Sequence, residues 1–255
     1  MKSLLSKSWR PLLVLLLLFI LWETAVIILD IPNWLLPAPN EIFLEATVNG
    51  DDLLVHLIST LKLTLTGFSI GTCIGLITAI FLYLLPKVKE AVYPLLILSQ
   101  NIPTIVLAPL LVIWFGFGLL PKIIVISLVC FFPVTVAALD GFKQTPAELK
   151  HYLAMAGANK QQLFWKLEFP YALPAIFSGI KISATYSVMG AVISEWLGAK
   201  EGIGVYMTLA SSSFRTDRVF VAIFTIMILS LLLFAIIQGL ERITVRWHHQ
   251  GEDMK

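Results

Sequence analysis

The residues of this chain that could do chemistry are few, and several of them lie in apolar surroundings. Glu23, Lys62, Lys181 and Glu195 all fall within or beside long apolar segments. Because an ionisable group is costly to place in a membrane, each needs a partner, a route to water or a role on a solute pathway. We expect Glu23 to make a hydrogen bond between helices or to lie at the interface, and the two lysines to extend toward the headgroups.

Glu195 has two alternative roles, and its sequence context leaves both open. It lies at the outer end of an apolar segment, just before the Gly-rich stretch GAKEGIGVYM that begins at Gly198. Its carboxylate could face the mouth of a translocation path. It could equally accept backbone hydrogen bonds from the turn that the Gly-rich stretch is expected to form.

The sequence contains no catalytic or nucleotide-binding motif. HExxH, GxSxG and Walker motifs are absent, as are Cys/His clusters and suitably spaced carboxylate pairs. The histidines do not cluster; they are His56, His151, His248 and His249. Cys73 and Cys130 lie in apolar runs, which indicates small packing residues rather than a disulfide or metal site. If the protein moves a solute uphill, its energy source is therefore expected on another chain.

The composition is that of a membrane protein. The 255 residues are 58% hydrophobic and 13% charged, and the mean hydropathy is +0.89, which no soluble globular domain requires. The formal charge of +2 gives no indication of nucleic-acid binding. We expect one all-α membrane domain over residues 1–255.

Six apolar segments are long enough to cross a hydrocarbon core of about 30 Å. They are Pro11–Leu29, Ser59–Leu85, Ala91–Phe115, Leu120–Leu139, Tyr171–Leu197 and Val219–Leu240. The first follows a basic tail, but its length and the lack of a small-residue cleavage site favour an uncleaved helix over a signal peptide.

Polar residues and prolines interrupt the third apolar segment. Gln100, Asn101, Pro103 and Pro109 fall within it. A broken helix at membrane depth is tolerated only against protein or a watery cavity. We therefore expect Gln100, Asn101 and Pro103 to line a translocation path, together with Tyr186 and Glu195.

Basic residues are distributed unevenly between the two sides that six spans would create. One side carries Lys2, Lys7, Arg10, Lys87, Lys89, Lys143, Lys150, Lys160, Lys166, Arg242, Arg246 and Lys255. The other carries Lys122, Lys200, Arg215 and Arg218, with an acidic first loop that contains Asp30, Glu41, Glu45, Asp51 and Asp52. The positive-inside rule predicts that both termini and the loop at 140–170 are cytoplasmic.

Glycines recur every four residues in the second apolar segment. Gly67, Gly71 and Gly75 form a stripe of the kind that lets two membrane helices approach closely. A phosphate-binding loop is the alternative, but no GKS or GKT follows. We therefore predict helix packing along this stripe.

The first half of the loop at 145–174 predicts a short capped helix. Thr145 and Glu148 have the spacing of a capping box, with Pro146 at the first helical position. Gly157 stands where a left-handed residue is expected to end the helix.

The second half of this loop predicts another short helix. Asn159 can cap it, and its apolar face would extend to Leu167. We expect Pro170 and Pro174 to stop this helix and to begin the next span. The loop as a whole is expected to be a helix, a glycine turn and a second helix.

This loop resembles the cytoplasmic signature of the inner-membrane permeases of binding-protein-dependent ATP-binding-cassette importers. The signature reads Glu-Ala-Ala, three residues, Gly, nine residues, Ile, one residue, Leu-Pro. Gly157 takes the glycine place, Leu167 the isoleucine place and Phe169-Pro170 the Leu-Pro place. The chain departs from the pattern at its start, where His151, Tyr152 and Leu153 replace Glu-Ala-Ala.

Further segments extend the resemblance over nearly the whole chain. They are LLPAP at 35–39, LAPLLVIWFGFG at 107–118, FFPV at 131–134, ALPAIFSGIK at 172–181 and GAVISEWLGA at 190–199. They are similar to the branch that imports sulfonates, taurine, nitrate, riboflavin or thiamine-precursor pyrimidines. The sequences at 99–122 and 178–199 look most similar to those of permeases for formylaminopyrimidine, a thiamine precursor.

The resemblance implies a type I importer permease fold whose loop at 141–170 forms a coupling helix against a cytoplasmic ATPase. The residues expected at that contact are Ala156, Gly157, Ala158, Lys160, Leu163, Phe164, Leu167 and Pro170. Small residues would allow close approach, Leu163 and Phe164 would supply an apolar anchor, and Lys160 a rim contact. The alternative is that the apolar residues pack on the loop's own neighbours.

The resemblance also implies partners and a location. An ATPase dimer would bind ATP and magnesium, so this chain needs no cofactor of its own, and a solute-binding protein would deliver the solute from outside. A second permease copy is expected, most simply as a homodimer and alternatively as a related chain. The expected location is the bacterial inner membrane. An ion-coupled transporter and a membrane enzyme or scaffold are the competing functions, and the sparse carboxylates and missing catalytic set disfavour them.

Overall fold

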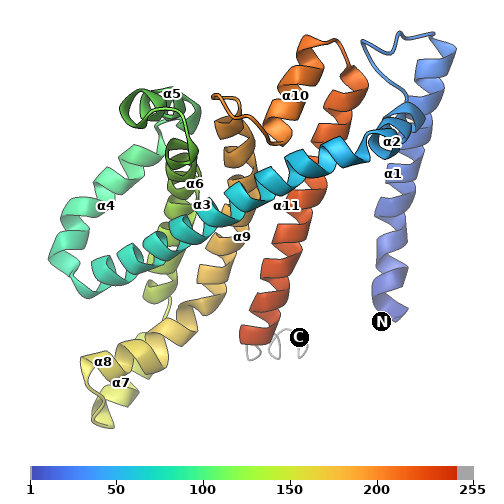
Figure 1. Cartoon of the computed structure of the whole chain (residues 1–255). Coiled ribbons are helices and arrows are strands. Elements are labelled where there is room, and N and C mark those ends of the chain that lie inside the picture. The colour runs from blue at the N-terminus through green and yellow to red at the C-terminus, as the bar shows by residue number, and fades with distance from the viewer. Residues whose placement is uncertain (1, 246–255) are drawn as a thin grey trace.

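The computed structural model describes residues 2–245, and that range is built from helices joined by short connections (Figure 1). The helices are α1 (Lys2–Ile28), α2 (Pro39–Val48), α3 (Gly50–Leu84), α4 (Pro86–Gln100), α5 (Thr104–Phe115), α6 (Leu119–Lys143), α7 (Ala147–Met155), α8 (Lys160–Leu163), the π-helical turn η1 (Phe164–Glu168), α9 (Phe169–Glu195), α10 (Ile203–Ser212) and α11 (Thr216–Thr244). This is the all-α membrane architecture that the composition predicts.

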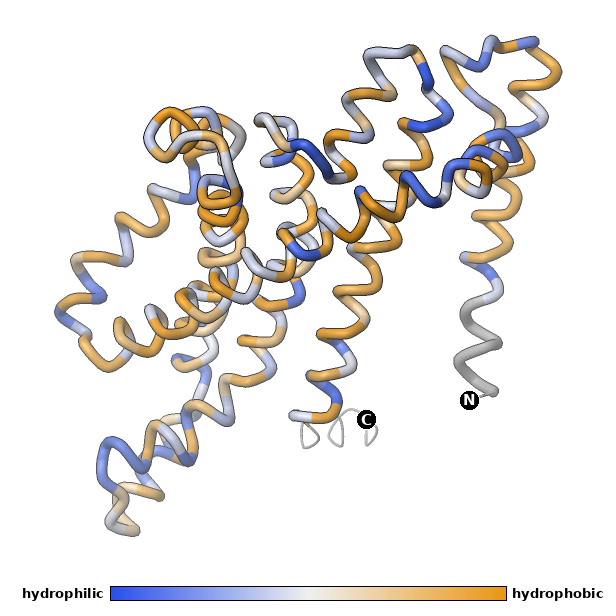
Figure 2. Tube along the Cα trace, in the orientation of Figure 1, coloured by the Kyte–Doolittle hydropathy of each residue, from blue (hydrophilic) through white to orange (hydrophobic). Residues whose placement is uncertain are grey.

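Five helical stretches within the described residues are long and apolar enough to cross a membrane. They are Trp9–Ile28, Gly50–Leu84, Leu119–Lys143, Lys160–Glu195 and Thr216–Thr244. Figure 2 shows α11 and the coloured part of α1 as mostly apolar, whereas polar residues gather in the α7–α8 region.

The sixth expected span is not a single helix. The segment predicted at 91–115 is divided between α4 and α5, which are joined by a break at residues 101–103. Pro103 has no amide hydrogen and precedes the first turn of α5, so the helix ends before it and restarts after it. Pro109, also expected to interrupt this segment, lies inside α5 without ending it.

The first outer loop is more helical than the sequence predicted. α3 begins at Gly50 rather than Ser59, and its first turn contains Asp51 and Asp52. Carboxylates are favourable at a helix N-terminus, so these residues belong to the helix and not to the acidic loop. A further helix, α2, forms within that loop.

The glycine stripe of α3 packs against α6, as predicted. A methyl group added at Gly67 would lie 2.6 Å from Ile126 Cβ, and one at Gly71 would lie 2.8 Å from Cys130 Cβ. At Gly75 it would lie 2.8 Å from the Phe131 carbonyl oxygen. Only glycine permits this backbone approach.

Polar hydrogen bonds join α6 to its two neighbours. The Ser127 hydroxyl donates to the Gly67 carbonyl at 3.2 Å, and the Thr135 hydroxyl lies 3.1 Å from the Gly75 carbonyl. On the other side, Ser183 of α9 donates to the Cys130 carbonyl at 2.9 Å. Cys130 is buried here, as predicted for a packing residue, whereas Cys73 is exposed, which contradicts that prediction for it.

The described start of α1 and the end of α11 lie at the same end of the molecule as α7 and α8 (Figure 1). This arrangement agrees with the expectation that the two termini share a side with the loop. Arg246, His248, His249 and Lys255, which entered the predictions above, lie outside the described residues.

Candidate functional site

The most distinctive feature of the α7–α8 end is a helical hairpin that projects beyond the long helices (Figure 1). Its turn is a Schellman motif: Ala158 N donates to Leu153 O at 3.0 Å, and Gly157 N donates to Ala154 O at 3.0 Å. Gly157 has φ +87°, the left-handed conformation that favours glycine. The prediction that Gly157 ends the first helix is therefore confirmed.

The second helix of the hairpin is capped by Asn159, also as predicted. Its side chain accepts a hydrogen bond from Gln162 N at 2.8 Å, and its own amide donates to the Gln162 side chain at 3.0 Å. These two reciprocal bonds form a complete capping box.

The capping box predicted for the first helix does not form. Pro146 is the N-cap residue of α7 and not its first helical residue, and no side chain caps the helix. The Thr145 hydroxyl is buried without a hydrogen-bond partner among the described residues. Pro146 has no amide hydrogen to donate and sets an extended backbone before it, which carries Thr145 away from the helix end.

The hairpin continues into the membrane helix without a stop, contrary to the prediction for Pro170 and Pro174. A π-helical turn at η1 joins α8 to α9, and the Phe169 amide donates to the Phe164 carbonyl. Pro170 sits in the first turn of α9, where its missing amide hydrogen costs little, and Pro174 is accommodated inside α9. A movement of the hairpin therefore acts on one end of a continuous helix.

Phe164 anchors the hairpin in the protein's own core. Its side chain is 2% exposed, with its ring centroid 5.3 Å from that of Phe142 and 5.7 Å from that of Tyr83. It is therefore not available as the apolar anchor for a partner. For Phe164 the alternative holds, because the residue packs on the loop's own neighbours.

A partly buried ion pair within the hairpin is joined to α3 by Tyr83. The Lys150 ammonium lies 2.7 Å from Glu168 Oε1, and the Tyr83 hydroxyl lies 2.8 Å from the same oxygen. Partial burial lowers the pKa of Lys150, but its hydrogen bonds with Glu168 and Tyr83 outweigh that effect and leave the pKa raised. Phe164 and this ion pair together tie the hairpin to the membrane helices.

The tip of the hairpin remains exposed. Ala156, Gly157 and Lys160 are exposed, whereas Ala158, Leu163, Leu167 and Pro170 are partly buried. Sequence reasoning missed three larger side chains on this surface: Met155 is 82% exposed, Tyr152 67% and Trp165 49%. The available sequence signal was a tyrosine and a methionine, Tyr152 and Met155, just before the glycine turn.

The expected path residues are not brought together in one cavity. Gln100, Asn101 and Pro103 are exposed around the break between α4 and α5, and Tyr186 is exposed on α9. The Asn101 amide group donates to the Ile97 carbonyl at 3.1 Å, which caps the end of α4. Glu195 lines a separate cavity, and none of these four residues lines it.

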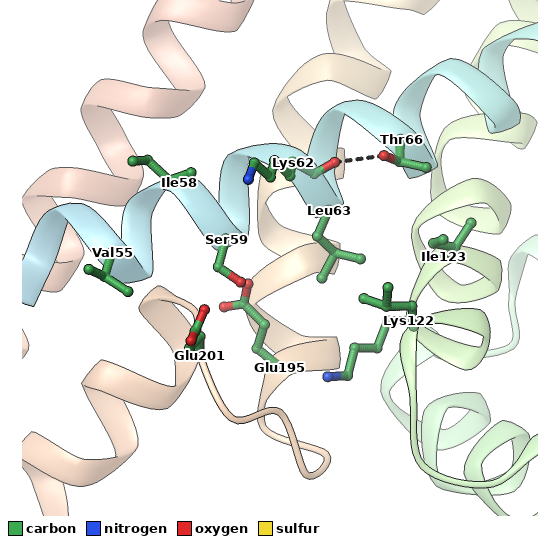
Figure 3. A pocket seen from close by; sticks show the side chains of 11 residues that line it. Val55, Ile58, Ser59, Lys62, Leu63, Thr66, Lys122, Ile123, Glu195 and Glu201 are labelled. Atoms are coloured by element: carbon green, nitrogen blue, oxygen red, sulfur yellow. Dashed lines mark hydrogen bonds between the residues drawn. The ribbon is translucent and has the colours of Figure 1, made fainter.

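Glu195 holds the turn before α10. Its carboxylate accepts hydrogen bonds from the Thr60 hydroxyl at 2.7 Å and from Gly204 N at 2.8 Å, and the side chain is 2% exposed. Thr60 in turn accepts from Ile203 N at 2.8 Å. A side chain at Gly202, which has φ +132°, would collide with the carboxylate. The backbone-binding alternative for Glu195 is confirmed, although the residue also borders a cavity (Figure 3).

The other charged groups of the spans either have structural partners or are exposed. Lys181 forms an ion pair with Glu241 at 2.8 Å, which replaces the expected extension to headgroups. Glu23 accepts a hydrogen bond from Asn40 N at the start of α2, at 3.2 Å. Lys62 is exposed on α3.

Comparison with known proteins identifies the family to which this architecture belongs. Residues 71–245 match the family model described as the inner membrane component of binding-protein-dependent transport systems. The chain belongs to this family. The permease is thus a membrane transport subunit of an ATP-binding-cassette importer and not itself an enzyme.

Relatives of the permease match it along most of its length. The formylaminopyrimidine transport permease protein ThiX of Halalkalibacterium halodurans is 37% identical over 94% of this chain and 96% of its own. The riboflavin transport system permease protein RibX of Chloroflexus aurantiacus is 33% identical over 91% of this chain and 88% of its own. The taurine transport system permease protein TauC of Escherichia coli is 29% identical over 91% of this chain and 86% of its own.

A solved structure shares the fold. The crystal structure of an amino acid ABC transporter with histidines matches at a TM-score of 0.63 and 17% identity, covering 80% of this chain and 97% of that one. The predicted importer permease fold is therefore confirmed.

Proposed function

We propose that the permease couples ATP hydrolysis on a separate ATPase to solute movement through the α7–α8 hairpin. The observation that carries the proposal is the rigid attachment of an exposed tip to buried helices. The tip presents Gly157 and Lys160 to the surroundings. At the base, Phe164 packs against α3 and α6, and the Lys150–Glu168 pair bonds to Tyr83 of α3. A push at the tip is then passed on as a rigid-body movement.

The family of the permease supports an ATPase and a solute-binding protein as its partners. The ATPase is a dimer that binds ATP and magnesium, and it docks at the hairpin tip through Ala156, Gly157, Ala158 and Lys160, with Leu163, Leu167 and Pro170 beside them. A second copy of the permease completes the path, and a solute-binding protein delivers the solute on the far side. Both termini and the hairpin are then cytoplasmic in a bacterial inner membrane.

The solute is a small polar molecule of the kind named for the relatives. Formylaminopyrimidine is the first candidate, because the relative named for it is 37% identical. Riboflavin, taurine and aliphatic sulfonates are the alternatives that other relatives' names supply, and nitrate is the further alternative from the sequence resemblance.

Uptake into membrane vesicles tests the proposal. We expect an ATPase subunit to co-purify with the permease, and uptake to stop when ATP is depleted but to survive collapse of the proton gradient. Uptake that persists without ATP and stops when the proton gradient collapses would instead identify an ion-coupled transporter. Binding of radiolabelled candidates to the cognate binding protein identifies the solute.

A further inference from the structure

A cavity of about 530 Å³ lies between α3, the start of α6 and the turn between α9 and α10. The cavity lies at the far end of the molecule from the α7–α8 hairpin, and its size suits a small organic solute. Lys62 and Thr66 line it from α3, Lys122 from α6, and Glu195 and Glu201 from the turn side; Figure 3 shows how these side chains lie. None of these residues contributes to the hairpin.

Lys122 is the unusual member of this group. Its side chain is 9% exposed, yet its ammonium forms no hydrogen bond or ion pair within 4 Å with any described residue. It also lies in the first turn of α6, which has no side-chain cap and no acidic residue. A cation is unfavourable at this positive end of a helix, and the ammonium opens onto the cavity, where it can bind an electron-rich group.

Neither nearby carboxylate forms an ion pair with Lys122 among the described residues. Glu195 is close enough for its charge to act on the ammonium, but both of its oxygens already accept hydrogen bonds, from Thr60 and from Gly204 N. Glu201 is exposed on the turn, and Lys62, also exposed, adds a second ammonium to the cavity wall. The groups left free to act on a solute are therefore two ammonium groups and one carboxylate.

We propose that this cavity is a subsite of the solute path that binds the oxygen-rich, hydrogen-bond-accepting end of the solute, with Lys122 as its principal donor. The inference rests on the proposed function. Sulfonate oxygens fit the site as charged acceptors, and formyl or ring carbonyl oxygens fit it as neutral ones. A solute that presents a cationic group to Lys122 is rejected.

Thiol labelling measures this preference without requiring transport. Thr66→Cys places a thiol in the cavity, in a Cys73→Ser background, because Cys73 is the exposed native thiol and Cys130 is buried. Three methanethiosulfonate reagents with the same ethyl arm are compared: sulfonate, hydroxyl and trimethylammonium. The reference thiol is Thr208→Cys, exposed on α10 outside the cavity.

Relative to the reference thiol, we expect Thr66→Cys to react several-fold faster with the sulfonate reagent than with the trimethylammonium reagent, and at an intermediate rate with the hydroxyl reagent. Lys122→Gln should abolish this order of labelling rates, and Lys122→Arg should keep it. Lys62→Gln, at an exposed position, should weaken it, and Glu201→Gln should strengthen it.

Equal relative rates for the three reagents, or a fastest reaction with the cation, would overturn the proposal. Lys62→Gln and Glu201→Gln change exposed residues, so opposite shifts of the order in these two variants test the proposal even if the Lys122 variants misfold. Because labelling needs neither ATP nor an ATPase, ordered labelling without ATP-driven uptake would reject the importer function alone. Normal uptake with unordered labelling would reject this subsite alone.

Discussion

At the residue scale, the hairpin depends on Phe164 and on the partly buried Lys150–Glu168 ion pair. Phe164 lies among Tyr83, Phe142 and Phe169, whose ring centroids are all within 6.2 Å of its own. The aromatic cluster is where α3, α6 and the hairpin meet. Its packing makes the hairpin part of the membrane domain rather than a loose loop.

Removing the Phe164 ring should loosen this junction. We expect Phe164→Ala to lower the free energy of unfolding by about 3–5 kcal/mol, through lost burial and the cavity left behind. The measurement is thermal unfolding in detergent. Trp165→Ala is the matched control, because Trp165 is 49% exposed, and an equal loss in both variants would contradict this account.

The ion pair predicts a dependence of stability on pH. Because the pKa of folded Lys150 is raised above its ordinary 10.5, its contribution is fully present below pH 10.5. That contribution is lost as pH rises through the raised pKa. Melting temperatures measured across this range should therefore fall less steeply for Lys150→Met than for Lys160→Met, which removes an exposed lysine. Parallel curves of melting temperature against pH for the two variants would show that the ion pair does not contribute to stability.

At the element scale, the contact between α3 and α6 positions everything else. The glycines of α3 bring its backbone against α6, and α9 packs on the other side of α6 through Ser183 and Gly179. The hairpin then connects the ends of α6 and α9. This element order explains why one loop can act on several spans.

Filling the glycine stripe should separate these helices. A side chain at Gly71 would collide with Ser127 and Cys130 of α6, so we expect Gly71→Val to cost several kcal/mol and to reduce the yield of folded protein. Cys73→Val, two residues along α3 on its exposed face, is the control. Similar melting temperatures for both variants would show that the close approach is not required.

Local patterns predicted the elements better than they predicted their partners. Residues close together in the chain determine the apolar segments, the glycine stripe, the Gly157 turn and the Asn159 cap. Phe164 was misassigned because an apolar face shows that burial is needed but not which surface supplies it. The partners of Glu195 could not be chosen from the sequence either, since Thr60 lies 135 residues away.

At the scale of the whole molecule, the proposed coupling and solute-binding functions lie in two distant regions. The α7–α8 hairpin is fastened to the membrane helices at one end, and the Glu195 turn with its lysine-lined cavity lies at the other. α9 runs from the hairpin to that turn as one helix. In the proposed mechanism, α9 connects the ATPase contact at the hairpin mechanically with the proposed solute subsite.

The central claim is that the hairpin tip carries the coupling, and the coupling ratio of the reconstituted importer tests it most directly. No heavy atom lies within 4 Å of a Cβ built at Gly157, so Gly157→Trp adds bulk to the docking surface without disturbing the hairpin's own packing. Gly157→Ala shares the strain of the left-handed conformation without that bulk. We predict that solute moved per ATP hydrolysed falls several-fold in Gly157→Trp and stays near the wild-type value in Gly157→Ala. An unchanged ratio in Gly157→Trp would contradict the account.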